Sequence, residues 1–478
     1  MSEAIETESA AEFIRPGSEQ DQIRGPIPAA KDMALQDINP VWNRLFAENR
    51  MLEYFERLRR EDPVHFNETD VAGRYWSLTR YDEIKAVDTD HKNFSSAAGI
   101  TIGFPIDQPL PEGALDISLF IAMDQPKHDV QRRTVSPVVS TRNLAEMESL
   151  IRERTAEVLD ALPEGETFNW VDEVSIELTT RMLATLFDFP YEERSKLTRW
   201  SDVATAVPGG GVIDTEEQRR TELIECLVYF QGIWEERKQN PTGDFVSMLA
   251  HGEDTKDMEP LEFLGNLILL IVGGNDTTRN SMSGGVLALN EYPSEYEKLK
   301  KDPSLIPNMV AEIIRWQTPL AYMRRTANQD CKVGDKDIKA GDQMLMWYVS
   351  GNRDESVFER GEELIIDRPN ARQHLSFGFG IHRCMGNRLA EMQLKVLWEE
   401  MMKRFEKAKK SYDEPVIIVT QEEAEKAEKS KSKDKKTWKL SAKMVRDFGF
   451  ATSRKFIWDM MAVKLDTKDV MAVSMYSK

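Results

Sequence analysis

The residues whose pattern points most directly to chemistry lie in a short glycine-rich segment around Cys384. The segment runs from Phe377 to Gly386 and reads FGFGIHRCMG. Its glycines allow a tight loop that brings backbone N–H groups close to the cysteine sulfur, and the helix expected to open near Gly386 adds its positive end. A thiolate supported in this way can ligate a metal, and on haem iron a thiolate donates electron density that favours O–O cleavage.

Other interpretations of Cys384 are weaker. A structural cysteine in a glycine-rich turn would need six matched positions to arise by chance, roughly a few-in-a-million event at ordinary residue frequencies. A zinc site is a poor match because no CxxC or HxxxH spacing accompanies Cys384. Cys226, Cys331 and Cys384 are too few and too scattered for a disulfide framework, so we expect a reducing, cytoplasmic location.

The decapeptide resembles the haem-binding signature of the cytochrome P450 family, and the resemblance extends over residues 40–405. It implies haem b as cofactor, with Cys384 as the axial metal ligand and Phe377 and Gly378 in the cofactor loop. It also implies the cytochrome P450 fold, a triangular helical domain that is mainly α with a small β region. In that fold the haem lies between a long central helix and the helix after the thiolate loop. The implied activity is that of a monooxygenase.

A structural triad is expected beneath the thiolate loop. Glu312 and Arg315 are three residues apart on a predicted helix, so they share a face and can form an ion pair. Alone, such a pair is a common surface feature. Here it resembles the family's ExxR pair, which Arg368 completes, and the resemblance implies a buried network that is costly to break.

Four side chains are expected to bind the haem propionates by the same resemblance: His128, Arg132, Arg325 and His382. For each one alone, a solvated or otherwise satisfied side chain is the commoner explanation. Gln125 replaces the proline that is usual before the first of these residues, a departure of small consequence.

A glycine pair interrupts the long apolar helix that we predict for Leu261 to Asn290. Gly273 and Gly274 cost roughly 1 kcal/mol each relative to alanine, so function is expected to compensate. Asp276 and Thr277 alone could cap or pack locally. The segment resembles the family's oxygen-activation motif, however. The resemblance implies space for dioxygen, a hydrogen bond from Thr277 to the oxygen being activated, and proton delivery by Asp276.

The substrate is expected to be apolar. Eight residues are predicted to line its pocket: Ile100, Ile102, Phe104, Leu269, Val272, Gly273, Leu320 and Met323. An apolar lining is also the default for any pocket. The wording of Ile271 to Thr278 and of His374 to Phe377 resembles the bacterial alkane terminal-hydroxylase subfamily, which implies ω-hydroxylation of medium-chain alkanes or fatty acids.

A monooxygenase needs two electrons, and the sequence carries no Rossmann fingerprint. We therefore expect a separate ferredoxin and an NAD(P)H-dependent ferredoxin reductase as partners. A cationic rim could attract an acidic ferredoxin, although some of its members could instead serve propionates or solvent: Lys127, Arg132, Arg133, Arg383 and Arg388. Two alternatives stay open. One is a peroxide-driven hydroxylase, against which Asp276 and Thr277 argue, and the other is a non-catalytic haem sensor, which would not need the glycine pair.

The surrounding elements are predicted as follows. Arg74 to Leu78 has the character of a strand, Tyr81 to Asp88 of a helix, and Cys331 to Trp347 of short strands, whereas helical patterns dominate from Asn143 to Lys300. We divide the chain into a flexible arm (1–40), a haem-thiolate monooxygenase domain (41–406) and an atypical basic segment (407–478). The last segment is either a divergent ending or an appendage, and Val416 to Thr420 is its one convincing strand.

Charge and hydropathy exclude two classes. The net charge of −19 argues against nucleic-acid binding, because no basic stripe dominates the sequence. The longest aliphatic run, Leu267 to Val272, is far shorter than the roughly 20 residues that span a bilayer. We therefore expect no membrane-spanning segment.

Overall fold

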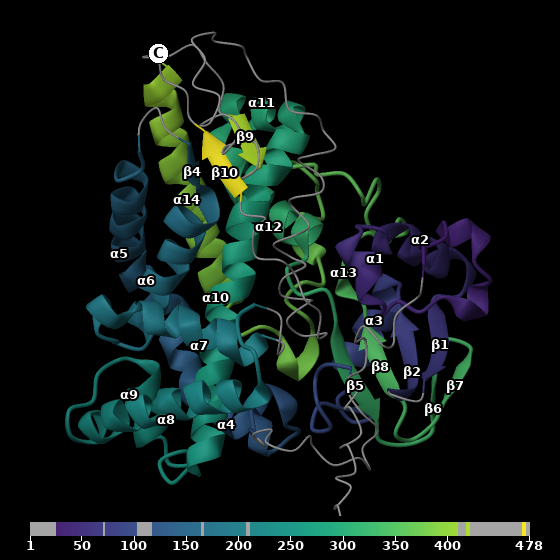
Figure 1. The fold of residues 1–478 in the computed structure, drawn as a ribbon, viewed down its shortest axis with the longest axis horizontal. Coiled ribbons are helices and arrows are strands. Elements are labelled where there is room, and N and C mark those ends of the chain that lie inside the picture. Colours follow the sequence, from purple (N-terminus) through teal and green to yellow (C-terminus); the bar gives the residue numbers. More distant parts are fainter. Residues whose placement is uncertain are drawn as a thin grey trace, which may run out of the picture.

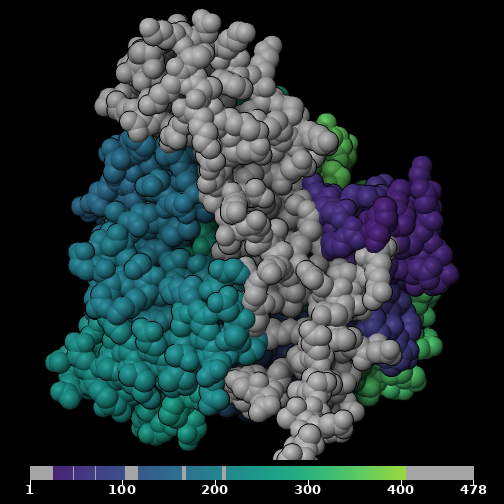
Figure 2. All heavy atoms as spheres, viewed as in Figure 1, coloured from purple at the N-terminus to yellow at the C-terminus, as the bar shows by residue number. Residues whose placement is uncertain are grey.

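The computed structural model describes residues 25–69, 72–102, 117–163, 167–206, 211–409, 417–420 and 471–474. The described residues form a mainly helical molecule with a small β region, as the sequence predicts. Most helices gather on one side, whereas α1 to α3 and the larger sheet lie on the other (Figure 1). In the space-filling view the two sides present separate areas of surface (Figure 2).

The helical side consists of long helices in sequence order. They are α4 (Lys127–Val135), α5 (Thr141–Asp160), α6 (Glu177–Leu186), α7 (Ser195–Thr205), α8 (Glu216–Gln239), α9 (Phe245–His251), α10 (Pro260–Glu291), α11 (Pro293–Lys301), α12 (Ile306–Gln317) and α14 (Asn387–Lys409). Local chemistry sets several starts. The Asp244 carboxylate accepts from the Val246 N–H (2.6 Å) before α9, and Pro260 occupies the first turn of α10.

The smaller side contains α1 (Asn43–Ala47), α2 (Met51–Glu61), α3 (Tyr81–Thr89) and α13 (Tyr348–Gly351) around a sheet. The sheet has the order β1 (Val64–Thr69), β2 (Gly73–Leu78), β8 (Gln343–Met346), β5 (Met323–Ala327) and β3 (Phe94–Ser95). Strands β2 and β8 are parallel, and the other pairs are antiparallel. A separate hairpin joins β6 (Cys331–Val333) to β7 (Lys336–Ile338).

Helix α10 crosses the interior of the helical side. Its bounds enclose the predicted range, Leu261 to Asn290, and it packs against α6, α7, α8 and α12. Most of its residues are buried, including a polar run from Asn275 to Ser283. A helix that is buried on nearly all sides is part of the core. One stretch, around Gly273, keeps accessible surface.

The N-terminal segment differs from the flexible arm that the sequence led us to expect. Residues 25–40 lie against α2: Ile27 and Ile38 are buried in the same cluster as Phe55, and the Tyr54 hydroxyl donates to the Pro28 carbonyl (2.7 Å). Prolines prevent periodic helices in this segment, but burial does not require periodicity. Residues 1–24 lie outside the described part of the chain.

The C-terminal segment also contacts the rest of the molecule. The predicted strand near Val416 is present as β9 (Ile417–Thr420), and β10 (Met471–Ser474) lies between β9 and β4 (Thr167–Asn169) in an antiparallel sheet. The remaining residues of 410–478 lie outside the description, so the domain boundary at 406/407 stays a prediction. Among the described helices, none combines the length and apolar character that a membrane crossing needs.

Candidate functional site

The predicted thiolate loop is a closed turn that leads into α14. The Cys384 N–H donates to the Phe377 carbonyl oxygen at 2.7 Å, so the loop returns on itself around Gly378 and Gly380. Both glycines have positive φ, +64° and +67°, a region that L side chains rarely adopt. The N–H groups of Gly386 and Asn387 donate to the Cys384 sulfur, at the positive end of α14.

Cys384 borders an interior space. Burial raises the pKa of its thiol, whereas the Gly386 and Asn387 N–H groups and the charges of Arg132 and Arg383 act in the opposite direction. The residue nonetheless keeps accessible surface. Dense surroundings and accessible surface together place the sulfur on the wall of an internal hollow. A cation in that hollow supplies the positive charge that a thiolate needs.

Two histidines meet beside the loop with unused hydrogen-bonding atoms. The rings of His128, on α4, and His382 are 4.2 Å apart. His128 Nε2 and both ring nitrogens of His382 are buried without a partner among the described residues. Burial lowers the pKa of His128, and burial followed by the charge of Arg325 lowers the pKa of His382 to about 2. Buried polar atoms are rarely left unpaired, so these nitrogens fit the propionates of a bound haem.

The two predicted arginines of this cradle are held by other groups as well. Arg132 Nη2 donates to the Arg383 carbonyl oxygen at 2.6 Å, which joins α4 to the thiolate loop. Arg325, on β5, forms a buried ion pair of 2.7 Å with Asp88 on α3. Sequence reasoning missed Asp88. An acid at the unfavourable end of the predicted helix Tyr81 to Asp88 was the available signal.

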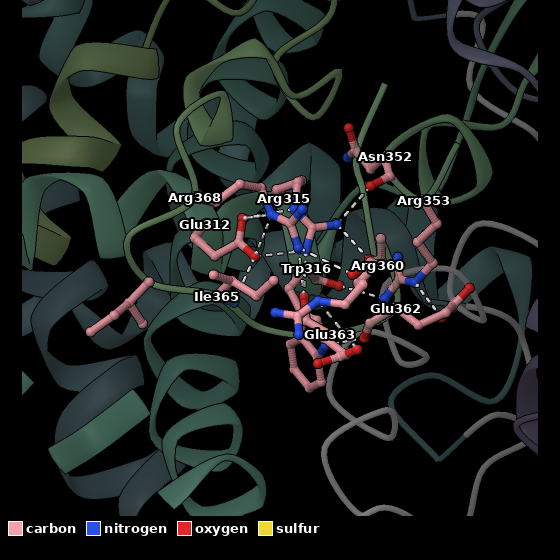
Figure 3. A network of polar contacts seen from close by, with 12 residues as sticks. Glu312, Arg315, Trp316, Asn352, Arg353, Arg360, Glu362, Glu363, Ile365 and Arg368 are labelled. Atoms are coloured by element: carbon pink, nitrogen blue, oxygen red, sulfur yellow. Dashed lines mark hydrogen bonds and ion pairs between the residues drawn. The ribbon is translucent and has the colours of Figure 1, made fainter. Parts of the chain in front are cut away.

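The predicted triad is assembled in full (Figure 3). Arg315 Nε and Nη2 each lie 2.8 Å from a Glu312 carboxylate oxygen, and Arg368 Nε lies 3.0 and 3.1 Å from the two oxygens. The Ile365 N–H adds a further bond to Glu312 at 2.9 Å. The side chains of Glu312 and Arg315 are completely buried, and that of Arg368 is nearly so.

Asn352 connects this triad to the thiolate loop. Arg315 Nη1 donates to the Asn352 carbonyl oxygen at 2.7 Å. The Asn352 side chain accepts from the Leu375 N–H (2.6 Å) and donates to the Ser376 hydroxyl (2.8 Å), at the start of the loop. The network therefore fixes where the loop begins. No local sequence pattern identifies Asn352, because its contacts are all distant in sequence.

The glycine pair in α10 serves two faces. A Cβ atom on Gly273 would meet nothing within 4 Å, whereas a Cβ on Gly274 would lie 2.9 Å from Cδ2 of Leu183 in α6. The Thr277 hydroxyl donates to the Gly273 carbonyl oxygen at 3.1 Å. The helix remains continuous through the pair. Gly273 therefore borders open space, and Gly274 allows close packing.

Asp276 is buried and paired with Arg279 on the next turn of α10. Arg279 Nη2 also lies 3.5 Å from the Asp202 carboxylate on α7, and the Asp202 side chain is 23% exposed. The predicted proton donor thus reaches the surface through two further charged groups, which sequence reasoning did not identify. Their signal was weak, since Asp202 and α10 are far apart in the chain.

The predicted pocket residues lie on three segments. Leu269, Val272 and Gly273 are on α10, Leu320 and Met323 are at the start of β5, and Ile100 and Ile102 follow β3; Phe104 lies outside the described residues. Ile102 is buried, and the other apolar side chains are half-buried. The Arg324 N–H donates to the Ile100 carbonyl (2.7 Å), and the Ile102 N–H donates to the Tyr322 hydroxyl (3.1 Å), so the third segment is fixed to the second.

The predicted basic rim has mixed partners. Lys127, Arg133, Arg383 and Arg388 are exposed, whereas Arg132 is half-buried. Lys127 forms an ion pair with Glu262 (2.9 Å), and Arg388 donates to the Thr141 hydroxyl. Because Arg132 contacts Arg383, this part of the rim adjoins the thiolate loop.

Comparison with known proteins agrees with this geometry. The cytochrome P450 family model matches residues 217–430. Linalool 8-monooxygenase of Pseudomonas putida is 34% identical over 377 residues, covering 77% of this chain and 92% of that protein. A methyl-branched lipid omega-hydroxylase of Mycobacterium bovis is 31% identical and covers 77% and 86%.

Solved structures give the same result. CYP153D17 from a Sphingomonas species is 48% identical, with a TM-score of 0.72 over 79% of this chain and 92% of that one. Cytochrome P450-153 from Novosphingobium aromaticivorans is 47% identical, with a TM-score of 0.71 and the same coverage. Family members bind haem through an axial cysteine thiolate, as the loop and the histidine pair lead one to expect. The chain belongs to the cytochrome P450 family and is a haem-dependent monooxygenase.

Proposed function

We propose that this monooxygenase hydroxylates the terminal methyl group of medium-chain alkanes or fatty acids, with electrons from a ferredoxin and its NAD(P)H-dependent reductase. The observation that carries the proposal is the accessible face of α10. Leu269, Val272 and Gly273 lie at helical spacing and keep accessible surface, although α10 is otherwise a core helix. An apolar face that opens inside the core suits an apolar substrate.

The names of two relatives support the same substrate class. One is an omega-hydroxylase of methyl-branched lipids, and the other oxidises linalool at carbon 8. The wording of the α10 motif and of His374 to Phe377 resembles the alkane terminal-hydroxylase subfamily.

In this proposal the chain holds the haem by three sets of side chains. Cys384 supplies the axial thiolate, and the Gly386 and Asn387 N–H groups stabilise its negative charge. His128, His382, Arg132 and Arg325 receive the propionates, which give the unpaired imidazole nitrogens their acceptors. Glu312, Arg315 and Arg368 hold the loop from beneath.

Mechanism follows from what these residues do with protons. Bound haem supplies the reduction and cleavage of dioxygen and the transfer of one oxygen atom to a C–H bond. The reaction consumes the alkane, dioxygen, two electrons and two protons, and releases the alcohol and water. Thr277 donates to the Gly273 carbonyl at rest and can rotate its hydroxyl toward the open space. Asp276 replaces the proton, and Arg279 and Asp202 connect it to solvent.

The electron donor is proposed on charge. The chain carries a net charge of −19, yet Arg133, Arg383 and Arg388 are exposed close to the thiolate loop and α4. A local cationic surface on an acidic protein attracts an acidic partner to one place. Arg132 is excluded from docking because it is half-buried against the Arg383 carbonyl.

Two measurements test the proposal. The reduced, haem-loaded protein under carbon monoxide should show the red-shifted Soret band of a thiolate-ligated haem, and the Cys384→Ser variant should lose it whereas Cys331→Ser keeps it. Turnover of octane and dodecanoic acid with ferredoxin, reductase and NADPH should then give 1-octanol and 12-hydroxydodecanoic acid. Mainly subterminal alcohols, or product formation only with hydrogen peroxide, would overturn the substrate or the electron-donor proposal respectively.

A further inference from the structure

Asp88 is a buried carboxylate that joins two parts of the haem site. Its Oδ1 atom lies 2.7 Å from Arg325 Nη2 on β5. Its Oδ2 atom accepts from the Phe379 N–H in the thiolate loop (2.7 Å) and from the Tyr348 hydroxyl (3.1 Å). One side chain on α3 therefore contacts both the proposed propionate arginine and the loop that carries Cys384.

The position of Asp88 is costly, so its contacts must compensate. The residue is 2% exposed and lies in the last turn of α3, where the helix dipole disfavours a negative charge. Burial acts to raise the pKa of Asp88, and its donors act to lower it, Arg325 most strongly. A buried carboxylate that accepts three bonds is held in one orientation. Arg325, which is equally buried, is held with it.

The backbone of the thiolate loop is pressed against the same end of α3. A Cβ atom on Gly380 would lie 2.6 Å from the Asp88 carbonyl oxygen, and one on Gly378 would lie 3.1 Å from Asp88 Oδ2. Both are glycines with positive φ, so the loop can approach closely. This packing is independent of the ion pair and also places the loop relative to Asp88.

We infer that Asp88 is a positioning residue that sets the haem reduction potential and preserves thiolate ligation, by fixing Arg325 and the thiolate loop to one another. The inference rests on the proposed placement of Arg325 at a propionate. The carboxylate shares the charge of Arg325, which otherwise acts entirely on the haem. It also prevents Phe379, and with it the loop before Cys384, from moving away from α3.

The test is the midpoint potential of the haem in the full-length holoenzyme. Asp88→Asn removes one negative charge near the haem and leaves the positive charge of Arg325 unshared, so the midpoint potential should rise. The carbon monoxide complex should also contain a larger fraction of the form without the red-shifted band. Asp82→Asn makes the same change of net charge on an exposed residue in the first turn of α3 and should leave both readouts unchanged.

Two further variants separate positioning from simple loss of stability. Tyr348→Phe keeps the charge of Asp88 but removes one donor, so the carboxylate is less neutralised and the midpoint potential should fall. Asp88→Glu keeps the charge and should restore the potential more fully than the proportion of thiolate-ligated complex. A wild-type protein without the red-shifted band would refute the haem assignment itself. If wild type shows the band, equal potentials in Asp88→Asn and Asp82→Asn refute the role of Asp88, as does a rise for Tyr348→Phe should Asp88→Asn fail to fold.

Discussion

The replacement of Glu312 by glutamine should destabilise the protein far more than a neutral, isosteric change usually does. Glu312 is completely buried and accepts hydrogen bonds on both oxygens, from Arg315 and from Arg368. Glutamine keeps one acceptor oxygen, turns the other atom into a donor that faces an arginine, and leaves two buried cations without a counter-charge. Breaking a buried pair by removal of one partner costs about 3–5 kcal/mol. That is a large share of the roughly 5–15 kcal/mol by which domains are stable.

Urea unfolding followed by far-ultraviolet circular dichroism measures this loss, with the midpoints compared at a common slope. Glu363→Gln is the matched control, because its side chain is 46% exposed in the same meander and its partner Arg360 is 3.6 Å away. The control should change the free energy of unfolding by less than about 1 kcal/mol. If Glu312→Gln lies within about 1 kcal/mol of Glu363→Gln, the triad is not the brace described above.

Three further outcomes are expected. Gly265→Ala should lower the free energy of unfolding by about 1–3 kcal/mol, because its Cβ would lie 2.2 Å from the Ser118 carbonyl oxygen. Gly232→Ala, on an open helix face, should raise it by up to about 1 kcal/mol in the same urea assay. Burial raises the pKa of Glu400, but neighbouring lysine and arginine side chains lower it to about 2, so its contribution is complete above its ordinary value of 4.5 and is lost as the pH falls toward 2. Glu400→Gln should therefore be less stable at pH 7 and should lose less further stability on acidification. His128→Leu should release haem to apomyoglobin roughly tenfold faster or more, since a hydrogen bond to a charged group contributes about 1.5–3 kcal/mol.

Contrary results are equally specific for these variants. Equal stability of the two glycine variants would mean that the segment at Ser118 yields to the new methyl group. A Glu400→Gln protein with the acid sensitivity of wild type would show that other carboxylates dominate in this pH range. An unchanged rate of haem release from His128→Leu would place the propionate elsewhere.

The parts of the site that the sequence predicts are those whose information is local. The thiolate loop is ten consecutive residues, and its positive-φ glycines and its closing hydrogen bond are found where the pattern places them. Helix α10 is predicted to within a residue at each end, since a long apolar run with few breaks has little choice of structure. Arg368 is far from Glu312 in the chain, and only the family resemblance joins them.

The remaining parts depend on which elements meet in space. Asp88 and Asn352 are single polar letters in a helix and in a turn, and neither has a periodicity or spacing that reveals its partners. The packing of residues 25–40 was missed for a different reason. Prolines indicate the absence of regular helix there, but they say nothing about burial of Ile27 and Ile38 against α2.

Gly273 and Gly274 are the same letter under two kinds of selection. A library of variants sorted only for folding should accept alanine or serine at 273, where there is room, and should reject larger residues at 274, where Leu183 is in the way. A library sorted for turnover should restrict both positions. The difference between the two libraries is a record of catalysis that neither conservation nor stability alone provides, because an alignment shows two invariant glycines and cannot say which of them the chemistry requires.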